Sequence, residues 1–265
     1  MKIGFIGCGN MASAIIDGII KNEITKENDI SIFDVFFPAV ESITSKYNVN
    51  LCEKASDIVR SSDAVILAVK PNVIASVLDE INYSLEESNT LIISIAAGKT
   101  IDFIRNTLSH DNRIIRVMPN INAKVGEAIS AYTANSYATK EDKALCEKLF
   151  GGVGKVMYLD EEMFPLFGVI AGCSPAFAYM FIDSLARAGV KNGMKKETAL
   201  FVAAQAVLGS AKMILESNEH PWELVDKVCS PGGTTIEGVA SLQQDGFENS
   251  VINAVDKAVD KDKKL

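Results

Sequence analysis

Two patterns of hydrophobic and polar positions divide the chain. From residue 1 to about 160, short apolar runs rich in β-branched residues alternate with amphipathic segments. The runs read "KIGFI", "DISIFD", "AVILAVK", "TLIISIAA", "RIIRVMPN", "AISAYTA" and "KVMYLD". Amphipathic spacing predicts helices between them, among others at 11–21, 38–47, 73–81 and 140–150. Near-continuous apolar strands separated by helices predict an α/β domain with a doubly wound, mostly parallel sheet that is covered on both faces.

Helical spacing replaces the strand pattern after about residue 160. Two long helices are predicted over "PAFAYMFIDSLARAGVKNG" and "KKETALFVAAQAVLGSAKMILES", and shorter ones at 221–227, 235–245 and 249–260. The stretch "LFVAAQAVLGSAKMI" is apolar or small on more than one face, which is typical of a helix buried on most sides. A segment of this length buries such a helix poorly on its own, so we expect a partner subunit to cover part of it. We predict two domains, 1–160 and an all-α domain at 161–265.

Composition and charge narrow the possible partners. The 34 Asp and Glu residues outnumber the 26 Lys and Arg residues, and the net charge of −8 argues against nucleic acid. The longest apolar stretch, 168–182, is shorter than a bilayer span and contains Pro175, so no membrane segment is expected. Five cysteines, odd in number and without CxxC spacing, favour a reduced, cytoplasmic protein. No metal site is expected.

The first chemical motif is "GCGNMA", which follows the apolar run "KIGFI" and precedes a predicted helix. In this strand–turn–helix context, Gly7 permits a tight turn, Gly9 lets a diphosphate approach the backbone, and Ala12 lets helix and strand pack closely. The N–H groups and the dipole at the start of the helix then attract the diphosphate. The motif therefore predicts a dinucleotide site.

Three further strand ends bear on that site. Asp34 ends the second strand, where an acidic residue usually accepts hydrogen bonds from the adenine ribose and favours NADH over NADPH. The small residues and proline at 68–71 and 96–98 lie at carboxyl ends of predicted strands and leave room for a nicotinamide ribose. Lys70 is equally well a ribose or phosphate contact and an ordinary surface lysine.

The second motif is "SPGGTTIEG", at residues 230–238. Thr234 and Glu237 have the spacing of a capping box with Thr234 as the N-cap, which would make the segment an ordinary helix start. The glycine pair and the second hydroxyl, on Thr235, fit instead a nest of N–H donors for a small carboxylate. From the residues alone, the two interpretations have equal support.

The segments "GFIGCGNMASAI", "LAVKP", "SIAAGKT", "GSAKMIL" and above all "VCSPGGTTIEGV" resemble pyrroline-5-carboxylate reductase, from Lys2 to near residue 260. The resemblance implies an N-terminal Rossmann domain and a helical C-terminal domain that interlocks with a second subunit. It implies that NADPH or NADH reduces the C=N bond of 1-pyrroline-5-carboxylate to L-proline in the last step of proline biosynthesis. It also implies a homodimer through the C-terminal helices, with a larger ring of dimers left open.

The resemblance carries site residues onto this sequence. The implied cofactor contacts, together with Asp34, are Ile6, Gly7, Cys8, Gly9, Asn10, Met11, Ala68, Val69, Lys70, Pro71, Ala96, Ala97 and Gly98. The implied substrate contacts are Val228, Ser230, Gly232, Gly233, Thr234 and Thr235. Thr235 is implied to lie beside the ring nitrogen and to act as the catalytic residue, because a protonated imine needs little more than alignment and one proton.

The chain departs from the family pattern in two places. The family often has Asn-Thr-Pro where this chain has Asn120, Ile121 and Asn122, and Ser-Gly-Ser-x-Pro-Ala where it has residues 171–176, "AGCSPA". Both departures bear on the ring pocket, so a reductase of another cyclic imino acid is an alternative. A dinucleotide-binding regulator without catalysis is a second alternative. A cysteine enzyme using Cys173 or Cys229 is a third, although neither has a histidine near it in sequence.

Overall fold

The computed structural model describes residues 1–263 and divides into two compact units. The N-terminal unit is Met1–Gly172, and the C-terminal unit begins at Cys173. The sequence places the domain boundary earlier, after residue 160. The helical segment between residue 160 and Gly172 packs with the N-terminal unit, so the change of sequence pattern and the change of packing do not coincide.

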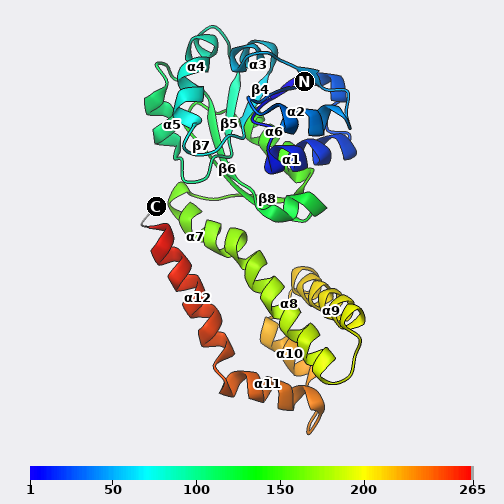
Figure 1. Ribbon diagram of the computed structural model, residues 1–265. Coiled ribbons are helices and arrows are strands. Elements are labelled where there is room, and N and C mark those ends of the chain that lie inside the picture. The colour runs from blue at the N-terminus through cyan, green and yellow to red at the C-terminus, as the bar shows by residue number, and fades with distance from the viewer. Residues whose placement is uncertain (264–265) are drawn as a thin grey trace. The chain divides into compact units, whose positions relative to one another are not determined.

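The N-terminal unit is built on one sheet, which has eight strands within the described residues (Figure 1). Their order is β3-β2-β1-β4-β5-β6-β7-β8, and all neighbours are parallel except β6 and β7. This confirms the predicted doubly wound, mostly parallel sheet. The strands are β1 (Ile3–Ile6), β2 (Ile30–Phe33), β3 (Asn50–Leu51), β4 (Ala64–Leu67), β5 (Leu91–Ser94), β6 (Ile114–Met118), β7 (Ala128–Ala134) and β8 (Gly154–Tyr158).

Helices cover both faces of the sheet because its strands are apolar on both sides. One face packs against α1 (Asn10–Lys21), α2 (Phe37–Thr44) and α6 (Lys140–Gly151), and the other against α3 (Ala55–Ser61), α4 (Ile74–Glu86) and α5 (Ile101–Thr107). Side chains alternate between these two cores along each strand, as in β4, where Ile66 belongs to the first core and Leu67 to the second. Short helical segments complete the unit: η1 (Glu27–Asp29), η2 (Ile121–Val125), η3 (Glu161–Met163), α7 (Phe164–Phe167) and the π-helical η4 (Gly168–Cys173).

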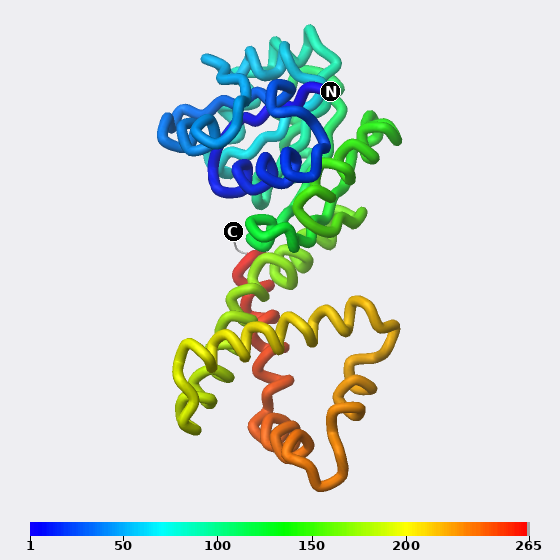
Figure 2. Tube along the Cα trace, turned by 90° about the vertical axis from the view of Figure 1, so that its right-hand side faces the viewer, coloured from blue at the N-terminus to red at the C-terminus, as the bar shows by residue number. Residues whose placement is uncertain are grey.

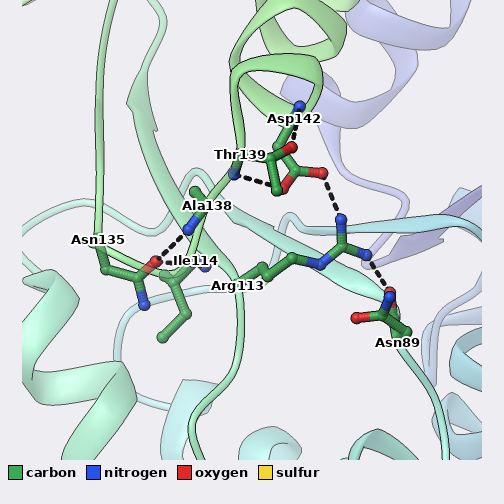
Figure 3. Close-up of polar contacts among 7 residues, drawn as sticks. All are labelled: Asn89, Arg113, Ile114, Asn135, Ala138, Thr139 and Asp142. Atoms are coloured by element: carbon green, nitrogen blue, oxygen red, sulfur yellow. Dashed lines mark hydrogen bonds and ion pairs between the residues drawn. The ribbon is translucent and has the colours of Figure 1, made fainter.

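A polar clasp ties the start of β6 to the start of α6 (Figure 3). The Arg113 guanidinium donates to Asp142 Oδ1 at 2.6 Å and also to the Asn89 carbonyl. Asp142 itself completes a capping box with Thr139 at the beginning of α6. Asn135 Oδ1 accepts the N–H of the first β6 residue at 3.1 Å. The clasp therefore joins β6, β7 and α6 at the edge opposite the carboxyl end of β6.

Removing the arginine of this clasp should destabilise the N-terminal unit. In Arg113→Met, the free energy of unfolding should fall by roughly 3 kcal/mol, because the Asp142 carboxylate, only 7% exposed, loses its partner. Arg60→Met is the matched control: its pair with Asp57 is about half-exposed at 3.8 Å, and its loss should cost less than about 1 kcal/mol. Denaturant titrations at one protein concentration measure both, and equal losses would contradict the clasp.

The C-terminal unit is all-α within the described residues and contains α8 (Ser174–Lys191), α9 (Lys196–Glu216), α10 (Pro221–Val228), α11 (Thr234–Gln244) and α12 (Phe247–Asp262). These agree with the predicted helices to within a few residues, and Figure 2 shows them in succession from green through yellow and orange to red. Small residues let α8 and α9 pack closely: Ala186, Ala199 and Ala203 form their buried core. A side chain at Gly189 would lie 3.1 Å from the Ala199 methyl group.

Two helical runs are long and apolar enough to cross a membrane by length and composition alone, Glu161–Lys191 and Lys196–Glu216. The expectation that the chain has no membrane segment therefore stays a prediction. It considered only 168–182, whereas η3, α7, η4 and α8 follow one another as a single helical run. Much of α9 is apolar and exposed in the single subunit: Phe201 is 70% and Leu215 85% exposed.

Candidate active site

The glycine-rich turn joins β1 to α1 at the point where the strand order reverses, between β1 and β4. Gly7 has φ +100°, and a side chain there would lie 2.6 Å from the Ala68 carbonyl oxygen at the end of β4. Gly9 is the N-cap of α1, and a side chain built on it would meet only open space. The start of α1 therefore faces an open crevice and has no side-chain cap among the described residues. Bare N–H groups at a helix start suit a diphosphate.

A crevice of about 360 Å³ lies beyond the carboxyl ends of β1, β4, β5 and β6. It brings together most of the residues predicted to contact a cofactor, which come from three separate turns: Gly9, Asn10, Met11, Ala68, Val69, Lys70, Pro71, Ala96 and Ala97. Ile6 is buried in β1 at 1% exposure and does not line the crevice. Gly98 has φ +71° in the turn after β5, next to the crevice residues of that turn.

Asp34 lies directly beside the glycine turn. Its Oδ2 accepts the Cys8 N–H at 2.7 Å, and its Oδ1 accepts the Phe36 N–H at 2.8 Å. Each oxygen keeps a second lone pair for a further donor. The Cys8 thiol is 2% exposed, and burial, with a smaller contribution from the Asp34 charge, raises its pKa to about 12. Cys8 therefore contributes its backbone to the turn and remains a neutral thiol at physiological pH.

Arg116 and its neighbours on β6 are crevice residues that the sequence analysis missed. Ile95, Arg116, Val117, Met118 and Pro119 complete the lining. A signal was present, because "RIIRVMPN" is a predicted strand and ligands in open α/β sheets bind beyond carboxyl strand ends. Arg116 is only 5% exposed, and its Nη1 donates to Glu161 Oε1 at 2.8 Å.

The two segments in which the chain departs from the family pattern are joined by Asn120, the residue of the first segment that matches the pattern. Asn120 is buried, its Nδ2 donates to the Ala171 carbonyl at 3.0 Å, and its Oδ1 accepts the Ile129 N–H at 3.3 Å. Ala171 belongs to the π-helical segment η4, and such segments often occur at functional sites. Met118, which lines the crevice, packs against Gly168 at the start of the same segment. Both departures thus adjoin the β6 end of the crevice.

The "SPGGTT" segment forms a tight turn followed at once by α11. The Gly233 N–H donates to the Ser230 carbonyl at 3.0 Å, and Gly232 has φ +65°, as in a type II turn with Pro231 before it. Of the two interpretations of this segment, the capping box with Thr234 as the N-cap is contradicted. Gly233 is the N-cap, in extended conformation, and Thr234 already belongs to the helix.

The glycine N-cap determines which partners are open to the first N–H groups of α11. A glycine N-cap offers them no side-chain oxygen, whereas α6 and α10 each begin with a complete capping box, the latter through His220. Thr235 is half-buried in the first turn, and Val228, at the end of α10, is 66% exposed. The start of α11 therefore has the donors that a small carboxylate needs.

Comparisons with known proteins agree on one family over the whole chain. Residues 161–265 match the family model described as pyrroline-5-carboxylate reductase dimerisation, and residues 2–98 match that of NADP oxidoreductase, coenzyme F420-dependent. The pyrroline-5-carboxylate reductase of Escherichia coli (strain K12) is 43% identical over 100% of this chain and 98% of its own length. The chain belongs to the pyrroline-5-carboxylate reductase family.

Solved structures of the family agree with this fold. A pyrroline-5-carboxylate reductase from Coxiella burnetii superposes with a TM-score of 0.93 at 32% identity, covering 99% of this chain and 97% of its own. The Plasmodium falciparum pyrroline carboxylate reductase with NADP bound gives 0.86 at 33% identity, covering 100% and 97%. The chain is thus an oxidoreductase that uses a nicotinamide cofactor, and its C-terminal part is a dimerisation domain. Exposed apolar surface of the kind found on α9 is typical of an interface between subunits.

Proposed function

We propose that this reductase converts 1-pyrroline-5-carboxylate to L-proline, with the crevice of the N-terminal unit holding the cofactor and residues 228–235 holding the substrate. Family membership over the full chain supports the reaction. The substrate site is supported by one observation at the start of α11. The N-cap is a glycine, and no side-chain oxygen from residues 1–263 accepts hydrogen bonds from the first N–H groups of the helix, where a ligand would bind.

The bound cofactor supplies a hydride to the C=N carbon. The chain itself must bind the cofactor, bind the substrate carboxylate and position the ring nitrogen. The start of α1, left open by Gly9, holds the diphosphate. The turn Ser230–Gly233 and the first N–H groups of α11 hold the substrate carboxylate. The Thr235 hydroxyl positions the ring nitrogen and its proton. A protonated imine is already electrophilic, so alignment is the main demand on the protein.

We propose that NADH is the preferred cofactor. The Asp34 carboxylate stands beside the glycine turn, and "VFFP" follows it without a positive charge for a 2′-phosphate. The Plasmodium falciparum relative has NADP bound, and the experiment below tests whether this chain differs from it. The carboxylate should repel a phosphate and accept a ribose hydroxyl.

Asp34→Ser should therefore shift the preference towards NADPH. We expect the ratio of kcat/KM for NADPH to that for NADH to rise by on the order of tenfold, because one like-charge repulsion is removed. Asp34→Asn is the matched control, since it loses the charge and keeps an acceptor for the Cys8 N–H. The Asn variant should shift the ratio in the same direction. A ratio that stays constant in both would show that Asp34 does not read the ribose.

We also propose a cytoplasmic homodimer formed through the C-terminal helices, with a ring of such dimers as the larger assembly. The dimerisation family match and the apolar exposed face of α9 support this. Light scattering of protein purified without detergent tests it. Purification only from the membrane fraction would favour the membrane interpretation of the two long apolar helices.

The reaction itself is tested by mixing purified protein with 1-pyrroline-5-carboxylate and NADH or NADPH, following loss of the reduced-cofactor absorbance, and identifying proline. Six-membered cyclic imino acids are compared in the same assay, because the departures near Asn120 and Ala171 adjoin the crevice. Faster turnover of the larger ring would replace the proposed substrate. Binding of reduced cofactor without turnover of any imine would favour the regulator.

A further inference from the structure

Arg116 is a buried cation in the wall of the cofactor crevice. Its guanidinium lies 4.5 Å from the centre of the Phe164 ring, a side chain with no exposed surface. The Arg116 side chain is 7% exposed and that of Glu161 28%. Such a charge is poorly hydrated, so its field reaches the crevice with little screening unless a nearby anion compensates it.

Glu161 is that anion. Its Oε1 accepts from Arg116 Nη1 at 2.8 Å and from the Ile101 N–H, at the start of α5, at 2.9 Å. The helix α5 follows the turn that contributes Ala96 and Ala97 to the crevice. Glu161 thus pairs with the charge of Arg116 in the crevice wall. It also holds the start of α5, the helix that follows the turn of Ala96 and Ala97.

The position of the pair along the sheet defines which end of the cofactor it faces. In a doubly wound sheet of order 3-2-1-4-5-6, the two halves of a dinucleotide lie on either side of the switch between β1 and β4. Asp34 follows β2 in the first half, and Arg116 is on β6 in the second. With the adenine ribose at Asp34, the nicotinamide is at the β4–β6 half, the half that contains Arg116. This step rests on the proposed function.

The two oxidation states of the nicotinamide differ by one charge. The reduced ring is neutral and the oxidised ring carries a positive charge, so an uncompensated cation in the wall disfavours the oxidised form. We propose that the Arg116–Glu161 pair keeps this end of the crevice close to neutral and thereby sets the relative affinity for oxidised and reduced cofactor. Glu161 then limits how far Arg116 repels the product form of the cofactor. This makes the pair a specificity determinant for redox state.

The test measures dissociation constants for NADH, by its fluorescence, and for NAD⁺, by competition, in the full-length protein. Glu161→Gln keeps the size and an acceptor and leaves Arg116 uncompensated, so the ratio of the NAD⁺ to the NADH constant should rise by on the order of tenfold. Arg116→Met leaves the glutamate alone, so the ratio should fall by a similar factor. The double variant Arg116→Met/Glu161→Gln should return to the wild-type ratio. Thermal melts report folding separately.

Opposite signs in the two single variants distinguish a charge effect from a packing defect, which would weaken both forms of the cofactor together. A ratio that does not move, or that moves the same way in both, overturns the inference. Should Arg116→Met not fold, Glu161→Gln and the double variant decide, because the ratio must rise in the first and recover in the second. Wild-type protein that binds neither form would refute the proposed function and this inference with it. Binding with an unmoved ratio refutes this inference alone.

Discussion

Replacing Thr235 by alanine should lower kcat by about a hundredfold, the lower end of what a positioned proton donor or acceptor contributes. Thr235 is half-buried in the first turn of α11, the turn whose N–H groups are proposed to hold the substrate. Alanine is a good helix former, so the helix itself should persist. Steady-state kinetics with saturating cofactor measure the loss.

Thr235→Ser is the control for this variant, because it restores the hydroxyl and removes only a methyl group. It should recover most of the turnover. The dissociation constant for NADH should be the same in all three proteins. An alanine variant with unchanged kcat and weakened NADH binding would assign Thr235 to the cofactor and refute the proposed role.

Replacing Gly233 by valine should raise the KM for the imino acid by on the order of a hundredfold. A side chain at Gly233 would lie 2.4 Å from Ser230 Oγ and 3.1 Å from the Ser230 carbonyl oxygen, and its methyl groups would cover the start of α11. The carboxylate would then lose about two charge-assisted hydrogen bonds, and at roughly 1.5 kcal/mol each their loss corresponds to about two orders of magnitude in KM. The NADH dissociation constant is measured alongside KM and should not change.

Gly238→Ala provides the matched control in the same helix, because a side chain there meets nothing within 4 Å. Its KM should equal that of the wild type. Comparable KM values for Gly233→Val and the wild type would show that the carboxylate binds elsewhere.

The arrangement of the N-terminal unit could be predicted because burial on both faces leaves a clear pattern in each strand. The runs "AVILAVK" and "TLIISIAA" are apolar except for Lys70, Thr90 and Ser94, as expected for β4 and β5 between two cores. Strand β3 left no such pattern, since it is only Asn50–Leu51 and both residues are exposed. Tertiary pairing with β2 creates this strand, and local sequence does not encode it.

The sequence predicts which turns line the crevice, but it does not predict the residues that β6 contributes to the crevice wall. A glycine in such a motif marks a position where two backbone segments lie too close together for a side chain, as Gly7 and the Ala68 carbonyl do. The spacing of Thr234 and Glu237 left a capping box and a carboxylate nest equally open, because the same letters occur whether the helix begins at one residue or the next. The pattern "RIIRVMPN" predicts a strand that ends near the site, but not that Arg116 is buried there and pairs with Glu161, 45 positions later, because that pairing is a property of the folded chain.

The exposed apolar surface of α9 has a consequence for how robust this protein is. In the proposed dimer a second subunit covers Phe201 and Leu215, and part of the free energy that stabilises each chain then comes from association. The stability of one subunit then depends on how many others surround it. Dilution or low expression should therefore lower the stability of each subunit, as a low concentration of denaturant does.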